Sequence, residues 1–133
     1  RAPRCGFLPR PAMPAPLVPP TARPVSSAVP ATFTHLVADF VGVPGAQLRD
    51  ATLLAGLLVA AAGAAGLAAH GAPAVRTLPD EGISGVLLVE GCHIALHTFP
   101  GEELLLLDVL ARATSAADRV VDVFARRLQA RTV

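Results

Sequence analysis

The chain contains no lysine, because all eleven of its basic residues are arginine. Without a lysine amine, an enzyme cannot hold pyridoxal phosphate as an internal aldimine, and it cannot form a lysine Schiff base with a substrate. A carbonyl group that withdraws electrons from a substrate would therefore have to be made from the polypeptide itself. The sequence excludes PLP in its usual lysine-bound form.

Charge and cysteine are also scarce. A net charge of +1 gives no argument for nucleic acid as a partner. The two cysteines, Cys5 and Cys92, do not make a disulfide framework, and Cys5 lies in an expected tail. We expect both thiols to be reduced in a cytoplasmic protein.

Tryptophan and tyrosine are absent, which bears on the long uncharged run of residues 51–69. At ~1.5 Å per helical residue this run would be ~28 Å long, near the thickness of a bilayer core. It has no aromatic belt and no basic cluster at its ends, and it is rich in alanine and glycine. We therefore favour a sheet-covering helix, from residue 46 to about residue 70, over a membrane span.

The prolines gather at the N-terminus. Residues 1–30 hold nine of the thirteen prolines, together with four arginines and no acidic residue. Proline breaks both helices and sheets, so we expect a disordered extension over residues 1–31. An arginine-rich, acid-free start also fits a transit peptide, but the prolines oppose its amphipathic helix and favour a linker or a misread start. Residues 32–133 form one domain, with enough apolar residues for a core.

The domain alternates short apolar runs with turn residues, as strands do. We expect strands over residues 32–43, 74–78, 85–89, 93–99 and 104–110, with the last one buried on both faces. Residues 104–110 could instead form a short helix, because periodicity alone does not decide between the two. A second helix is expected from Thr114, with an apolar stripe through Val120, Val121, Phe124 and Leu128. The predicted fold is α+β: a mostly antiparallel sheet with two helices on one face, a two-layer αβ sandwich. The other face would need cover, which a homodimer would supply.

The groups that could do chemistry gather between Gly82 and Pro100. Cys92 follows a glycine between two apolar runs, which predicts two strands that meet at a turn or break. There the thiol lies next to the carbonyl group of Gly91 and could attack its own preceding peptide bond. A free thiol pKa of about 8.5 leaves a few per cent of thiolate at neutral pH, so sulfur is a better nucleophile than a serine hydroxyl.

These residues carry a resemblance. The segments 82–85 (GISG), 92–100 (CHIALHTFP) and 34–40 (THLVADF), with Asp108, resemble the small prokaryotic S-adenosylmethionine decarboxylase proenzymes, over roughly residues 33–131. In that family a serine at the position of Cys92 attacks the preceding carbonyl, and the chain splits to leave a pyruvoyl group that decarboxylates the substrate. The resemblance implies a role in polyamine (spermidine) biosynthesis, a homodimer, and Ser84 and His97 as the residues that assist processing.

The sequence also departs from the family pattern. Cys92 replaces the nucleophilic serine, Gly91 replaces a glutamate, and Arg112 stands where the family has its catalytic cysteine. Phe99 and Gly101 replace a tryptophan and a glutamate, and Leu78 replaces an aromatic residue. The resemblance implies that Phe99, Leu78 and Arg112 lie at the substrate pocket, for S-adenosylmethionine or a related amino acid.

Three hypotheses follow. In the first, Gly91–Cys92 cleaves and a pyruvoyl group forms from Cys92. In the second, the intact chain uses Cys92 as a catalytic thiol with His97 or His93. In the third, the protein is a catalytically lost or regulatory paralogue that pairs with an active relative.

Strand geometry limits these hypotheses. A regular strand would put Cys92 and His97 on opposite faces, so they can meet only if the chain turns at Cys92, as Gly91 permits. His93 and His97 would share a face but lie about 13 Å apart, too far to share one metal ion. We therefore expect no metal site.

Overall fold

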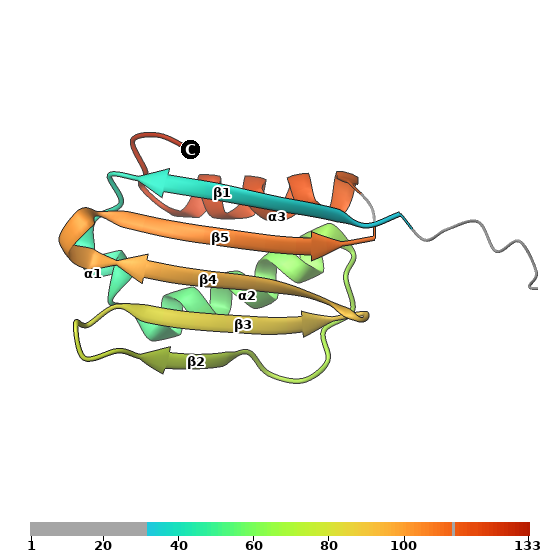
Figure 1. Ribbon diagram of the computed structural model, residues 1–133, viewed down its shortest axis with the longest axis horizontal. Coiled ribbons are helices and arrows are strands. Elements are labelled where there is room, and N and C mark those ends of the chain that lie inside the picture. The colour runs from blue at the N-terminus through green and yellow to red at the C-terminus, as the bar shows by residue number, and fades with distance from the viewer. Residues whose placement is uncertain (1–31, 113) are drawn as a thin grey trace, which may run out of the picture.

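The computed structural model describes residues 32–112 and 114–133, which form one antiparallel sheet and a layer of helices (Figure 1). The predicted extension, residues 1–31, lies outside the described residues. The strands are β1 (Thr34–Val41), β2 (Ala74–Thr77), β3 (Ile83–Val89), β4 (Cys92–Phe99) and β5 (Leu104–Ala111). The helices are α1 (Gly45–Leu48), α2 (Ala51–Ala65), α3 (Thr114–Arg127) and a 3-10 turn, η1 (Pro100–Glu102).

The strand order across the sheet is β1-β5-β4-β3-β2, and every neighbouring pair is antiparallel. β3 and β4 form a hairpin closed by Glu90 and Gly91, with Val89 paired to Cys92. Both turn residues have positive φ, 40° and 75°, as the tight two-residue hairpin turns that follow strand twist require. The predicted α+β class with an antiparallel sheet is confirmed.

Helices α2 and α3 lie on the same side of the sheet (Figure 1). The core fills the space between these layers, and its largest fully buried side chains include Phe40, Phe124, Leu54, Leu58, Leu87 and Ile94. The rings of Phe40 in β1 and Phe124 in α3 have centroids 6.2 Å apart and hold α3 against the sheet edge. We call the other side of the sheet, which no described helix covers, the open face.

The prediction that residues 104–110 are buried on both faces is wrong. Along β5, fully buried residues alternate with half-buried ones. Leu105, Leu107 and Val109 point into the core, whereas Leu104, Leu106 and Leu110 lie on the open face. The run is almost continuously apolar because both faces of this strand carry leucine or valine, with Asp108 as the exception, but helices cover only one of the two faces.

The single helix predicted for residues 46–70 is instead two helices. The break falls at Asp50, whose carboxylate accepts a hydrogen bond from the Leu53 N–H (2.9 Å) and caps the start of α2. The helix ends at Gly66, whose left-handed φ of 71° is the usual stop for a helix. In the described part of the chain, no helix is both long and apolar enough to span a bilayer.

Candidate functional site

The segment Gly82-Ile83-Ser84-Gly85, which leads into β3, makes close contacts with the neighbouring elements. A Cβ atom on Gly82 would lie 2.6 Å from the carbonyl oxygen of Thr98, so only glycine allows this approach to β4. The Ile83 N–H donates to the hydroxyl of buried Thr98 (2.8 Å), and that hydroxyl donates to the carbonyl of Leu48 (2.8 Å). Gly85 faces α2 in a space that leaves a side chain little room.

Ser84 and His97 form a hydrogen-bonded pair on the open face, which we call the Ser84–His97 dyad. They lie directly opposite each other on β3 and β4, with Ser84 Oγ 2.9 Å from His97 Nδ1. When the imidazole carries its proton on Nε2, the hydroxyl donates to Nδ1. This arrangement lets His97 accept a proton through Ser84, or exchange one directly at Nε2.

The dyad lies in a shallow hollow of about 340 Å³ over strands β2, β3 and β4. Most of the surface that lines the hollow is apolar, and the polar side chains in the lining are Arg76, Ser84 and His97. The other lining residues are Ala74, Gly85, Val86 and Ala95. A hollow with an apolar floor and a few convergent polar groups is typical of small-molecule sites.

Cys92 lies at the other end of the hairpin and on the other face of the sheet. It is the first residue of β4, its side chain is only 6% exposed, and it belongs to the core cluster that packs against the helices. Glu90 and Gly91, just before it, are exposed. The peptide bond between Gly91 and Cys92 is therefore at an exposed turn, while the thiol points inward.

The expectation that a turn at Gly91 lets Cys92 meet His97 is wrong. The turn ends before Cys92, and β4 then continues in regular alternation of buried and open positions through Phe99. Five residues of strand separate the two side chains by about 16 Å, on opposite faces. Within one chain, the structure brings Ser84 and His97 together and leaves Cys92 apart.

The three residues expected at a substrate pocket are scattered. Leu78 is exposed beyond the end of β2, outside the hollow. Phe99 is half-buried at the end of β4, two positions after His97 on the same face. Arg112 is exposed after β5, and its guanidinium lies over the ring of Phe33, 4.9 Å from the centroid. None of the three lines the hollow that holds the dyad.

A second polar cluster on the open face was missed by the sequence analysis. Asp108 Oδ1 lies 2.9 Å from His35 Nε2 and 3.2 Å from His93 Nε2, which joins β1, β4 and β5. Partial burial alone would raise the pKa of Asp108, but the hydrogen bonds and charge of the two imidazoles outweigh it and lower the pKa overall. Among the described residues, no group of three or more histidine, cysteine or acidic side chains is arranged to hold a metal ion.

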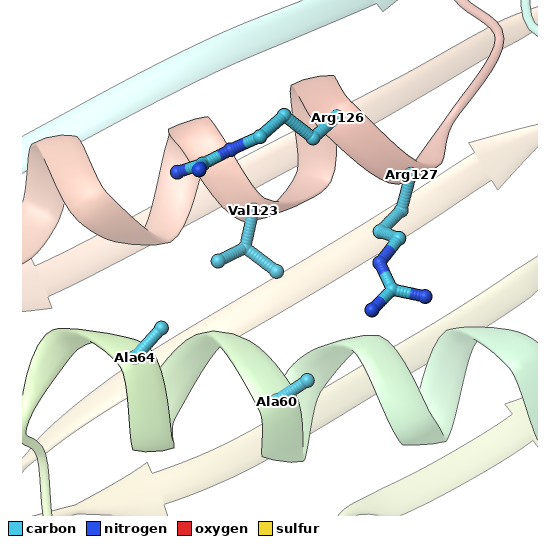
Figure 2. A pocket seen from close by; sticks show the side chains of 5 residues that line it. All are labelled: Ala60, Ala64, Val123, Arg126 and Arg127. Atoms are coloured by element: carbon cyan, nitrogen blue, oxygen red, sulfur yellow. The ribbon is translucent and has the colours of Figure 1, made fainter.

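The helix layer carries a separate groove between α2 and α3. Figure 2 shows the side chains of Arg126 and Arg127 from α3 above the small residues of α2. The groove measures about 320 Å³ and is lined by Ala60, Ala64, Val123, Arg126 and Arg127. It lies on the far side of the sheet from the Ser84–His97 dyad and contains no acid, base or nucleophile suited to catalysis.

The chain is similar to known proteins in a family model, in a curated sequence and in solved structures. The family model described as S-adenosylmethionine decarboxylase matches residues 34–133. The chain is 35% identical over 77 residues to an arginine decarboxylase proenzyme of Aeropyrum pernix, in a match that covers 56% of this chain and 58% of that protein. The chain thus spans little more than half the length of that curated relative.

A solved structure is also similar to the chain. The crystal structure of the adenosylmethionine decarboxylase from Aquifex aeolicus VF5 superposes with a TM-score of 0.69 and 26% sequence identity. The match covers 76% of this chain and 83% of that chain.

Proposed function

The chain belongs to the S-adenosylmethionine decarboxylase family, whose members are pyruvoyl-type proenzymes, and from this premise we propose that it cleaves itself at Gly91–Cys92. The product would be an amino-acid decarboxylase of polyamine biosynthesis, with S-adenosylmethionine or a related amino acid as substrate. The observation that carries the proposal is the position of that peptide bond. It lies in an exposed, left-handed turn, and the chain's one described cysteine follows it directly.

The cleavage chemistry balances with the atoms of this chain and water. The Cys92 sulfur attacks the Gly91 carbonyl carbon, and the peptide C–N bond breaks to give a thioester and a free amine. A base then removes the α-proton of Cys92 and the Cβ–S bond breaks, which leaves a thiocarboxylate on Gly91 and dehydroalanine at position 92. Tautomerisation to an imine and hydrolysis by water release ammonia and leave the pyruvoyl group, a carbonyl that serves as electron sink in decarboxylation.

The base for the second step cannot be His97 of the same chain, since it lies about 16 Å away on the other face. The open face offers a solution. Val37 of β1 and Leu88 of β3 are 62% and 57% exposed there, and the open-face leucines of β5 lie next to β1. Such apolar side chains suit contact with a second copy. In the dimer that we propose, the two-fold axis runs between paired open faces and across the strands, which would bring the dyad of one chain near the Cys92 end of the other. The Cys92 side chain points toward the helices, so in this proposal the partner's dyad reaches the α-carbon of Cys92 from the open face.

The mass of the purified chain tests this proposal. We expect two fragments, residues 1–91 and 92–133 of this sequence, with the first ending in a thiocarboxylate and the second beginning with a ketone that borohydride reduces. The Cys92→Ser variant should give the same second fragment, but its first fragment should end in an ordinary carboxylate, lighter by the difference between sulfur and oxygen. Cys92→Ala, the matched control, should stay whole. Self-cleavage would be refuted if both the parent chain and the Cys92→Ser variant stayed whole after long incubation.

A second candidate function rests on Arg112. In the family pattern, the position of Arg112 holds the catalytic cysteine, whose thiol serves as the acid. In this chain the side chain is an exposed cation over the Phe33 ring. A guanidinium does not donate a proton at neutral pH. A chain that is never cleaved would fit a regulatory partner of an active relative, and it would co-purify with that relative as a whole chain. Loss of a measured activity on Cys92→Ala, without cleavage of the parent, would instead favour an intact enzyme that uses the thiol.

A further inference from the structure

The hollow that holds the Ser84–His97 dyad also contains one permanent positive charge. Arg76 in β2 is directly opposite Ser84 in the strand register, so its side chain stands beside the dyad on the open face. The seven lining residues include this guanidinium and one imidazole, but no carboxylate.

The charge of Arg76 is not neutralised by the described protein. Its one hydrogen bond is from Nη1 to the carbonyl of Val75, its own neighbour, at 3.3 Å. The two acids in the turn between β2 and β3 have other partners: Glu81 Oε2 lies 2.8 Å from Arg49 Nε, and Asp80 Oδ1 accepts from the Gly82 N–H at 3.1 Å. Four of the five guanidinium donors therefore remain for a ligand, in a geometry that suits a carboxylate.

We propose that this hollow binds a small molecule with a short apolar body and a carboxylate, and that the carboxylate pairs with Arg76. Applied to the decarboxylase of the previous subsection, on which this step rests, the substrate is then not S-adenosylmethionine but the alternative named there, a related amino acid, and one of the acidic class. A substrate with a cationic side chain, such as arginine or the sulfonium of S-adenosylmethionine, would meet a like charge beside the dyad, with no acid in the lining to offset it.

The reaction itself limits which carboxylate Arg76 holds. An ion pair to the carboxylate that leaves as carbon dioxide would stabilise the ground state, because that charge disappears in the transition state. The pair is useful only on a second, side-chain carboxylate. Loss of carbon dioxide and gain of one proton would then give an amine that keeps its side-chain carboxylate.

Binding to the full-length Cys92→Ala variant tests this proposal without requiring cleavage. The variant is titrated with L-glutamate, L-glutamine and L-arginine, and the imidazole NMR signals of His97 report occupancy. Glutamate and glutamine have the same shape and the same α-carboxylate, so their difference isolates the side-chain charge. We expect glutamate to bind roughly fivefold tighter than glutamine, as for a partly exposed charge-assisted pair, and arginine to bind most weakly.

Variants of Arg76 identify the residue responsible. Arg76→Gln should remove the preference for glutamate, and Arg76→Glu should reverse it in favour of arginine. Arg126→Gln, the matched control, changes an exposed arginine on the helix layer and should leave the preference unchanged. Equal binding of glutamate and glutamine, a preference for arginine, no binding of glutamate, or loss of the preference in Arg126→Gln would each overturn the proposal. Because this variant cannot cleave, failure of self-cleavage in the parent chain does not affect the result.

Discussion

Asp108 shows how individual residues tie the open face together. One carboxylate oxygen serves two imidazoles, His35 from β1 and His93 from β4, so three strands meet at a single atom. Partial burial raises the pKa of Asp108, but the two histidines outweigh it and bring it below its usual value of 3.8. The carboxylate therefore remains ionised over a wider range of acidity than an isolated aspartate.

This shift gives a pH prediction with a definite sign. A lowered folded pKa means that Asp108 stabilises the fold above the unfolded pKa, and that this contribution disappears as the pH falls through the folded pKa. A carboxyl carbon NMR titration should place Asp108 below 3.8. His35→Gln and His93→Gln should each raise its pKa, since each removes one donor and its charge. His70→Gln, a change of an exposed histidine outside the cluster, should leave it unchanged, and an equal shift in that control would contradict the assignment.

At the level of elements, the β3–β4 hairpin carries both halves of the candidate site. Gly82, just before β3, and Gly85, within it, differ in what lies beside them. A Cβ on Gly82 would meet the backbone oxygen of Thr98 at 2.6 Å, whereas one on Gly85 would meet the end of the Leu58 side chain at 3.3 Å. A backbone carbonyl in a central strand cannot move away, but a leucine methyl group can.

We therefore expect different costs for the same substitution. Gly82→Ala should lower the free energy of unfolding by about 1–3 kcal/mol, the usual cost of overpacking. Gly85→Ala should be near neutral, because the reduced freedom of the unfolded chain offsets a small rearrangement of Leu58. Gly101→Ala, which meets nothing within 4 Å, is the control and should not destabilise. Urea denaturation measures all three, and a larger loss for Gly85→Ala than for Gly82→Ala would contradict this account.

The hairpin was predictable from the sequence because its constraints are local. Two apolar runs around Glu90–Gly91 predict a two-residue turn, and counting outward from that turn places Ser84 opposite His97, as the structure has it. The helix break was also signalled, since Asp50 before an apolar run is a typical helix start. The Asp108 cluster was not predictable, because it depends on pairing β1 with β5, which are some seventy residues apart in the chain.

For the whole molecule, the separation of Cys92 from the dyad makes oligomeric state part of the proposed chemistry. If the dyad of one chain serves the turn of another, then a chain without a dyad should be cleaved only beside a chain that has one. Cys92→Ala supplies an intact dyad and cannot be cleaved. His97→Ala supplies a cleavable turn and lacks the base.

The two variants can be produced together to test this. We expect His97→Ala to stay whole when produced alone and to split when produced with Cys92→Ala, as seen by denaturing electrophoresis with a different tag on each chain. In the control, His97→Ala is produced with the double variant Cys92→Ala/His97→Ala instead of Cys92→Ala. This double variant lacks the base and should not rescue cleavage. Cleavage of His97→Ala when it is produced alone, without any chain that carries an intact dyad, would exclude the two-chain arrangement.

The order of strands has a consequence for what a cut at Gly91–Cys92 would leave behind. β4 and β5, from the later fragment, are inserted between β1 and β3 of the earlier one, and α2 from the earlier fragment lies in the same layer as α3 from the later one. The fragments can separate only if the β1–β5 and β3–β4 pairings both break, so the two cleaved polypeptides would migrate as one particle until they are denatured. For the same reason, we expect that the fold, without the pyruvoyl group, could also form from two separately produced chains, residues 1–91 and 92–133, with an initiator methionine in place of Cys92.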